Sequence, residues 1–421
     1  MNLFRKDIHQ VFTPRSPEVN PEMYIARPGL EEDLQNALAG TLHILIHGES
    51  GCGKSWLYKR VLGTCGAHFA SANLANASRL DSITKEMANL VARGQKPQKT
   101  GFDETKQAEG SLGIPGIGGA KAGLNHTSKY EVPEKDPVEA CLEMVRSEAG
   151  SKPACLVLDN LEAIFAQPKL MKELGDIVTL LDDPNYSAHK VKLVIVGIPA
   201  DVLDYFARSQ NRLTIANRIY ELREVGALTR GQADELVRKG FVDELRVSLD
   251  AATLKLIQDH VAWITMGIPQ CLHEYCLELA LFCKANAWGF DEKFLIAADE
   301  KWLRSGLSTN YAAVTEMMNE RDTSAGRRNQ VLFCLGKIES DTLRHTDMED
   351  IVRAEFPIST SGVTLNVPAV LAEIAKGRNP AIKRTPKGDS YRFVAPRFRM
   401  CIRTMLVKTG EKVSKVDLSK I

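Results

Sequence analysis

One stretch near the N-terminus constrains the fold of this chain more than any other. Residues 48–55 fit the pattern G-x-x-x-x-G-K-[ST], with the sequence Gly48-Glu49-Ser50-Gly51-Cys52-Gly53-Lys54-Ser55. A short apolar run, 42–47, precedes the pattern, and apolar residues at helical spacing follow from Trp56 onward. Strand, glycine-rich turn and helix in this order direct backbone N–H groups at a phosphate. The sequence therefore predicts a phosphate-binding P-loop between a buried parallel strand and a helix.

The side chains of this loop have expected roles in binding ATP. Lys54 would reach the β- and γ-phosphates, and Ser55 would hold Mg²⁺ through its hydroxyl group. Gly51 and Gly53 would supply backbone torsions and a close approach that a Cβ atom would block. We therefore expect the whole loop, together with Trp56, to contact the nucleotide.

The composition is that of a globular protein with two or three domains. The chain has 421 residues, 44% hydrophobic and 25% charged, and a net charge of +1. A surface for nucleic acid would therefore have to be local. The nine cysteines contain no C-x-x-C pair, which argues against a zinc site and suits a reducing cytoplasm. No apolar run approaches the roughly 18–20 residues of a membrane span, and no signal peptide is visible, so we expect a cytoplasmic protein.

A second apolar strand ends in a carboxylate. Residues 154–158 are apolar and Asp159 follows them, as in a Walker B strand, whose aspartate holds the Mg²⁺ shell. Asn160 comes next and Glu162 two residues later. Two interpretations remain open. Glu162 polarises the attacking water from a shifted position, or hydrolysis is slow and the site is a switch.

The chain becomes helical after Thr229, which suits an N-cap. Helices are expected at about 230–239, 249–265, 269–286 and 291–304. Pro269 suits the first turn of the third helix.

The last third of the chain has the pattern of a winged helix. Helices are expected over 327–338, 346–355 (capped by Thr346) and 366–376, before a hairpin within 381–393. The basic residues of the third helix end and the hairpin are Lys376, Arg378, Lys383, Arg384, Lys387 and Arg392, and Arg397, Arg399 and Arg403 continue the charge. These side chains either neutralise DNA phosphates or are solvated charges on a domain that binds protein. The third helix offers few side chains that read bases, so sequence-specific recognition is not expected.

These motifs together resemble the AAA+ ATPases of the origin-recognition (initiator) clade and their STAND relatives. The resemblance rests on 48–55, 155–159, Gly267-Ile268-Pro269 and the winged-helix pattern, and it covers about 24–405. It implies an α/β fold, with a five-stranded parallel P-loop sheet, a helical lid and a C-terminal winged helix. It also implies Mg²⁺-dependent ATP hydrolysis coupled to oligomerisation. The chain lacks the usual Asp-Glu pair, a polar sensor 1 residue in 192–199, where Asn211 is a weak substitute, and a sensor 2 arginine, whose place Gln270 takes.

The resemblance also suggests roles for two arginines and a proline. Arg27 would lie near the adenine, unless it is a solvated residue at a helix start. Arg218 would be an arginine finger that acts on a neighbouring subunit, with Arg212 as a second candidate; an intramolecular salt bridge is the alternative. Pro269 would belong to the nucleotide-contacting turn of the lid, unless it marks a simple helix break.

We expect five segments along the chain. These are an extended arm (1–23), an ATPase core (24–228) with a flexible insertion at about 94–134, a helical lid (229–320), a winged helix (321–408) and a tail (409–421). The insertion is rich in Gly, Lys, Ser and Pro. It is either a loop that reaches a partner or DNA, or a plain spacer.

The sequence thus predicts an ATP-driven switch that oligomerises, with Arg218 acting in trans, and engages DNA or a separately encoded effector protein. Anti-phage defence, transposition regulation and replication initiation are the candidate pathways. The alternative is a nucleotide-bound scaffold whose winged helix binds protein. A DNA-translocating motor is disfavoured because no pore-loop aromatic residue stands out.

Overall fold

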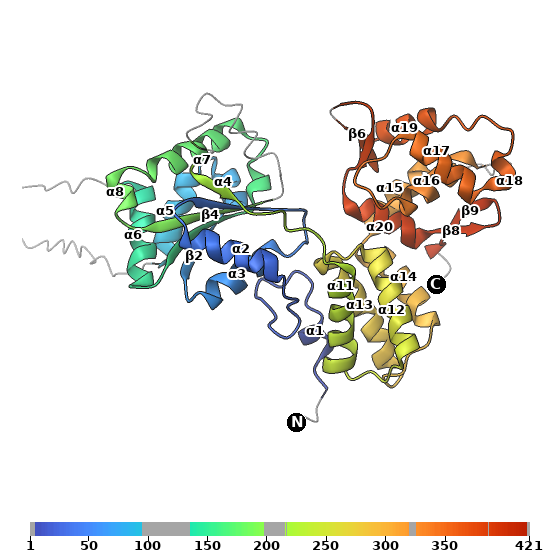
Figure 1. The fold of residues 1–421 in the computed structure, drawn as a ribbon, viewed down its shortest axis with the longest axis horizontal. Coiled ribbons are helices and arrows are strands. Elements are labelled where there is room, and N and C mark those ends of the chain that lie inside the picture. The colour runs from blue at the N-terminus through green and yellow to red at the C-terminus, as the bar shows by residue number, and fades with distance from the viewer. Residues whose placement is uncertain are drawn as a thin grey trace, which may run out of the picture. The chain divides into compact units, whose positions relative to one another are not determined.

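The computed structural model describes residues 5–94, 135–197, 215, 217–319, 326–385 and 387–418. Most of the predicted insertion lies outside these ranges, as do Asn211, Arg212 and the end of the segment 192–199, where a sensor 1 residue was sought. The chain divides into two compact units, each described by itself (Figure 1). The sheet unit contains Glu32–His47 and Arg60–Glu224, and the lid unit contains Met1–Glu31, Gly48–Lys59 and Val225–Ile421.

The sheet unit is built on five parallel strands in the order β2-β3-β4-β1-β5, which confirms the predicted fold class. The strands are β1 (His43–His47), β2 (His68–Asn73), β3 (Ala154–Asp159), β4 (Val191–Gly197) and β5 (Ile219–Glu221). Strands β1, β3 and β4 are almost continuously apolar and buried, as strands covered on both faces must be.

The helices that accompany this sheet shield the apolar strands from water. They are α4 (Leu74–Leu80), α5 (Ile83–Gly94), α6 (Pro137–Ala149), α7 (Pro168–Leu180) and α8 (Pro184–Ser187), and a 3₁₀ turn, η1 (Leu161–Ala163), follows β3. Leu142 and Val145 of α6 and Leu174 of α7 share one buried cluster with Leu156 and Ile195 of the sheet. Helices α2 (Pro28–Ala39) and α3 (Lys54–Thr64) belong in part to each unit.

The lid unit contains the helices predicted after Thr229. They are α11 (Arg230–Arg238), continued by a π-helical turn over Lys239–Glu244, α12 (Ala251–Thr265), α13 (Pro269–Ala285) and α14 (Lys293–Ser305). Thr229 and Gln232 form a reciprocal capping box at the start of α11, as the N-cap prediction requires.

The N-terminal arm is not extended throughout, so this part of the prediction is wrong. Ile8–Val11 form a short helix, α1, and Ile8, Val11 and Phe12 are buried. The Phe12 ring lies 5.2 Å from that of Phe241, and a Cβ atom on Gly240 would lie 2.3 Å from the Phe12 ring. Apolar residues three and four apart place one face of this turn against the lid, which favours helix over extended chain.

The C-terminal part contains the three predicted helices and the hairpin. Its elements are α15 (Ser308–Met317), α16 (Arg327–Lys337), α17 (His345–Glu355), α18 (Pro357–Thr360), α19 (Val367–Lys376), β6 (Ile382–Arg384), β7 (Tyr391–Phe393), α20 (Pro396–Met405), β8 (Leu406–Thr409) and β9 (Lys412–Lys415). Strands β6 and β7 pair antiparallel; Pro386, in the turn between them, lies outside the described residues.

Two expectations for this part are corrected, and two helices are additional to the prediction. Helix α17 begins at His345, so Thr346 is not its cap; the Arg344 N–H instead donates to the Asp347 carboxylate. The segment 409–421 is not a tail throughout, because β8 and β9 form a second hairpin. Helices α15 and α20 were not predicted.

The three arginines of α20 do not extend the exposed basic surface, which is a further correction. Arg397 forms an ion pair with Glu274, Arg399 donates to the Glu339 carbonyl, and Arg403 donates to the Gly336 carbonyl. All three are half-buried or buried. These side chains therefore lie against other parts of the protein and do not form an exposed basic surface.

In the part of the chain that the structure describes, no helix has the length and apolar character needed to cross a membrane.

Candidate functional site

Glycines at 48, 51 and 53 permit the tight course of the P-loop. Gly51 and Gly53 have φ values of +82° and +89°, in the left-handed region that side chains disfavour. A Cβ atom on Gly48 would lie 2.3 Å from the Val225 carbonyl oxygen. The loop leads directly into α3, which begins at Lys54. The torsions expected for Gly51 and Gly53 are therefore present.

The two polar residues that open α3 lie where the pattern predicts them. The Lys54 ammonium donates to the carbonyl oxygens of Gly48 (2.7 Å) and Glu49 (3.0 Å), so it is held over its own loop. Ser55 is the second residue of the helix. The first turn of α3 thus combines a cation, a hydroxyl group and the positive end of a helix dipole.

The start of lid helix α13 contacts the P-loop. Pro269 is the first residue of α13, and the Gln270 N–H donates to the Gly51 carbonyl (3.2 Å). Gly267 has a φ of +69°, and a Cβ atom there would lie 2.6 Å from the Leu228 carbonyl oxygen. The Gly-Ile-Pro sequence thus makes a turn that only glycine accommodates, and this turn brings Pro269 and the P-loop together.

The Arg27 side chain binds the backbone of the P-loop. Its guanidinium group donates to the carbonyl oxygens of Cys52 (2.8 Å) and Gly226 (2.9 Å). Its backbone N–H donates to Glu31, which also accepts a hydrogen bond from the Tyr24 hydroxyl. Burial lowers the pKa of Arg27 from its ordinary value. Arg27 is therefore not a solvated residue at a helix start.

The arm, helix α3 and the lid meet around Trp56. The indole N–H donates to the Ser16 carbonyl (3.1 Å), and the ring lies edge-on to that of His273 (5.6 Å). His273 Nδ1 accepts from the Thr13 N–H (3.2 Å), and burial lowers the pKa of its imidazole to about 4. The residues that line a small pocket here include Tyr24, Arg27, Gly53, Trp56, Leu228, Pro269 and His273. Nothing in the local sequence pattern points to His273.

A half-buried polar network runs from the P-loop contact to α20. The Gln270 amide donates to Glu274 (2.8 Å), and one guanidinium nitrogen of Arg397 donates to both Glu274 oxygens (2.7 and 3.0 Å). Burial raises the pKa of the Glu274 carboxyl group, but the hydrogen bonds from Arg397 and Gln270 outweigh it and hold this pKa below its usual range. Sequence reasoning missed this network because Arg397 lies 123 residues from Glu274 along the chain.

The Walker B residues lie at the end of β3, in the sheet unit. Asp159 is the last residue of the strand, and its carboxylate accepts from the Asn160 N–H (2.8 Å). Asn160 is left-handed (φ 66°), and its amide donates to the Asn73 side chain (3.0 Å). Glu162 lies in η1 and is exposed. Asn160 is thus tied to the end of the neighbouring strand, and Glu162 is the carboxylate directed to solvent.

Arg218 lies at the opposite edge of the same sheet. It directly precedes β5, and its side chain pairs with Asp182 of the same chain. Its carbonyl oxygen accepts from the N–H of His43, the first residue of β1 (2.8 Å). An intramolecular salt bridge is therefore present. Because Asp159 ends a parallel strand and Arg218 precedes one, Arg218 cannot approach Asp159 of its own chain without rearrangement.

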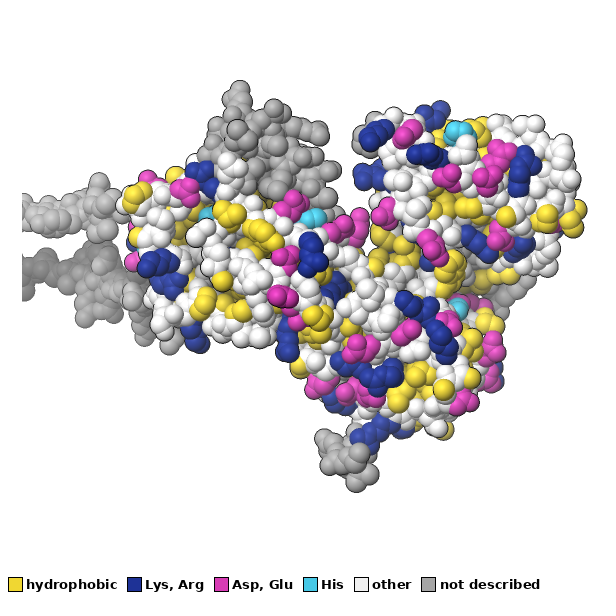
Figure 2. Space-filling view, in the orientation of Figure 1, with side chains coloured by type: hydrophobic (Ala, Val, Ile, Leu, Met, Phe, Trp, Pro, Cys, Tyr) yellow, Lys and Arg dark blue, Asp and Glu magenta, His cyan; other side chains and the backbone are white. Residues whose placement is uncertain are grey.

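The β6–β7 hairpin carries the predicted basic residues on its surface. Lys383 lies directly across from Arg392, and Arg384 across from Tyr391. Lys383, Arg384, Lys387 and Arg392 are all exposed. Figure 2 shows Lys and Arg side chains around the β6 end of this part of the molecule. Like charges directly across a hairpin destabilise it unless an anion compensates them.

Comparisons with known proteins agree with this architecture. Residues 38–206 match the protein family described as an AAA domain. The fold is that of an AAA-type P-loop ATPase. Two similar solved structures are a Walker-type ATPase of Pyrococcus abyssi (14% identity, TM-score 0.50, 92% of this chain and 99% of that chain) and the ORC2 protein of Aeropyrum pernix in its ADP form (14%, 0.51, 94% and 97%). No curated protein matches the sequence.

At this level of identity, the similarity to solved structures establishes the shared fold alone. Among the described residues, no three His, Cys, Asp or Glu side chains gather into a metal-binding cluster. Ser55 and Asp159 remain the oxygen donors that the AAA-type motifs would assign to Mg²⁺, in keeping with the preference of this ion for oxygen.

Proposed function

We propose that this chain binds Mg-ATP at the loop Gly48–Ser55 and uses it as a switch. The observation that carries the proposal is the loop itself, with left-handed glycines, a helix N-terminus and Lys54 within one turn. Phosphate oxygens would replace the Gly48 and Glu49 carbonyl oxygens as acceptors for the Lys54 ammonium. The pocket beside Arg27 has aromatic and apolar walls of the kind that bind a base, but its volume is only about 30 Å³, so a base would enter only after the side chains around it move apart.

In this proposal Ser55 and Asp159 would hold Mg²⁺, which would neutralise charge on the phosphates, and Glu162 would orient the attacking water. Asn160 occupies the place of the usual catalytic glutamate and is bonded to Asn73. We therefore expect slow hydrolysis, so that the bound nucleotide persists long enough to act as a signal.

We further propose that the chain oligomerises and that Arg218 acts on the nucleotide of a neighbouring copy. Its position, at the sheet edge opposite Asp159, supports a role in trans. The ion pair with Asp182 would then have to open as the subunits assemble.

The C-terminal part would act as a winged helix, as expected of the initiator clade, and its hairpin would contact DNA phosphates. The cross-strand pair Lys383–Arg392 supports this role. The alternative is a scaffold whose C-terminal part binds protein, and the exposed Ile358 (80%) and Val363 (50%) favour it as a second candidate. A separately encoded effector and the pathways of defence, transposition and replication remain compatible with either.

Isothermal titration calorimetry with Mg-ATP tests whether the P-loop binds the nucleotide. Removing one charged hydrogen-bond donor costs about 2 kcal/mol, so Lys54→Ala should weaken binding roughly 30-fold. Lys59→Ala is the matched control, because this lysine lies on the same helix but donates to the arm at Pro17. Equal affinities of Lys54→Ala and the wild type would refute the assignment.

A further inference from the structure

A groove of about 320 Å³ lies between lid helices α11 and α12 and the C-terminal helices α16 and α20. Its lining includes Arg230, Ala233, Trp263, Glu339, Arg399 and Arg403, and we refer to it as the arginine groove. Its volume lies within the range of about 300–1,000 Å³ that small-molecule sites occupy. None of its lining residues belongs to the P-loop, although Met266 and Gly267 of the turn before α13 also line it, and it has no role in the function proposed above.

Among the described residues, no carboxylate accepts a hydrogen bond from the guanidinium groups of Arg399 and Arg403 in this groove. Arg399, which is 5% exposed, donates to the carbonyl oxygens of Glu339 and Ser340, and its Nε is buried without a partner. Arg403 donates to the carbonyl oxygens of Gly336 and Trp263 (both 2.6 Å). These acceptors are neutral, so they fix the two side chains without cancelling their charge.

The electrostatics of the pair favour an added anion. Burial, together with the charge of Arg399, lowers the pKa of Arg403 to about 10. Glu339 opposes this shift, but its side chain is exposed. Arg230 already has Asp234 and Asp259 as partners at the rim. Guanidinium groups that retain unused N–H donors are well suited to phosphate.

The groove also contains an aromatic surface. Trp263 is 39% exposed, and the Arg403 guanidinium lies 3.7 Å from the centre of its ring. A partly exposed indole beside a fixed arginine can stack on a nucleobase, and such stacking contributes about 1–3 kcal/mol per base.

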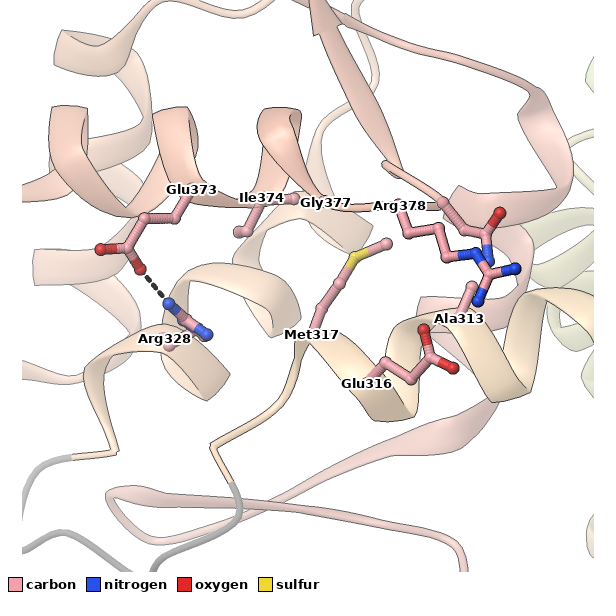
Figure 3. A pocket seen from close by; sticks show the side chains of 9 residues that line it. Ala313, Glu316, Met317, Arg328, Glu373, Ile374, Gly377 and Arg378 are labelled. Atoms are coloured by element: carbon pink, nitrogen blue, oxygen red, sulfur yellow. Dashed lines mark hydrogen bonds and ion pairs between the residues drawn. The ribbon is translucent and has the colours of Figure 1, made fainter.

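A second pocket, shown in Figure 3, does not have the excess positive charge of the arginine groove. It has a volume of about 170 Å³, between α15, α16 and α19. Arg328 pairs there with Glu373, and Glu316 and Arg378 both point into it. Two arginines and two glutamates balance one another, so this pocket does not select an anion.

We propose that the arginine groove binds the phosphate of a nucleotide, with Arg399 and Arg403 supplying the charge and Trp263 stacking on the base. The nucleotide has two conceivable sources, a free mononucleotide or one unit of a single-stranded nucleic acid. Both present the same phosphate and base to the groove.

Calorimetric titration distinguishes the sources. AMP and the oligonucleotide dT12 are titrated separately into protein kept in excess Mg-ADP, which would fill the P-loop. The variants are Trp263→Leu, which changes a partly exposed side chain, and Arg403→Lys. Arg238→Gln is the matched control, since this arginine lies on α11 beyond the groove and pairs with Asp243.

At least one probe should bind the wild type and bind Trp263→Leu about tenfold more weakly, while the control is unchanged. Binding of AMP would identify a mononucleotide site, and binding of dT12 alone a strand site. The proposal is overturned if neither probe binds at millimolar concentration. It is also overturned if both folded variants bind every probe as the wild type does, since the anion would then be held elsewhere, for example at the β6–β7 hairpin.

Discussion

His273 is held neutral where the arm, α3 and α13 meet. Its folded-state pKa of about 4 lies below the ordinary value of 6.5. Burial and the nearby charge of Lys192 likewise lower the pKa of His43 in the sheet unit to about 4. In both cases the unfolded chain takes up the proton first as the pH falls. The stability linked to each imidazole is therefore fully present above pH 6.5 and is lost as the pH falls toward 4.

Thermal unfolding between these two pH values tests this linkage. Each neutral imidazole contributes about 1.4 kcal/mol per pH unit, so His273→Phe should unfold with a shallower pH dependence than the wild type. His345→Gln, at an exposed position, is the control and should keep the wild-type slope. If the slope of His273→Phe matched that of the wild type, the imidazole would not be held neutral.

At the residue scale, the sequence predicted those features that are determined by residues close together along the chain. The glycine torsions of the P-loop, Pro269 at a helix start and Asp159 at a strand end all follow from local pattern. The Arg27 clamp on Cys52 could not be predicted, because it depends on how distant segments fold together.

At the scale of elements, α13 and α20 are joined by the half-buried pair Glu274–Arg397. The two side chains are 13% and 24% exposed. Removing one partner leaves the other charge poorly solvated, which costs several times more than losing an exposed ion pair.

Chemical denaturation measures this difference. Arg397→Met should lower the free energy of unfolding by on the order of 3 kcal/mol, and the double variant with Glu274→Met should recover part of the loss. Arg238→Met, which breaks an exposed pair, should have a much smaller effect. An equal loss in the two single variants would show that the Glu274–Arg397 pair is effectively solvated.

The β6–β7 hairpin supports a second prediction at this scale. If Lys383 and Arg392 contact DNA phosphates, replacing both with alanine should weaken duplex binding and reduce its salt dependence by about one unit of slope per residue. Lys408→Ala, on the other hairpin, is the control, since this lysine is bound to Glu355. An unchanged salt slope in the double variant would favour the scaffold alternative.

Secondary-structure elements were predictable to different degrees. Strong apolar periods and capping residues located strands β1 and β3 and helices α11 to α14 well. Helix α20 was missed because Arg397, Arg399 and Arg403 gave its segment the composition of a solvated surface. Hydrogen bonds to backbone carbonyl groups and, for Arg397, to Glu274 hold these guanidinium groups in place, and the local sequence contains no sign of those partners.

At the scale of the whole molecule, the proposed nucleotide switch links copies of the chain. The P-loop and the turn Met266–Gln270 lie in one compact unit, in contact with each other. Arg218, proposed to act in trans, is paired with Asp182 in the single chain. Assembly should therefore require bound nucleotide and should exchange this ion pair for one across a subunit interface.

Mass photometry with and without Mg-ATP tests this claim most directly. We predict that ATP shifts the wild type from the monomer to multiples of its mass, that Lys54→Ala stays monomeric, and that Arg218→Ala binds ATP yet assembles weakly. A wild type that binds ATP by calorimetry but keeps the same mass distribution with and without it would contradict the account.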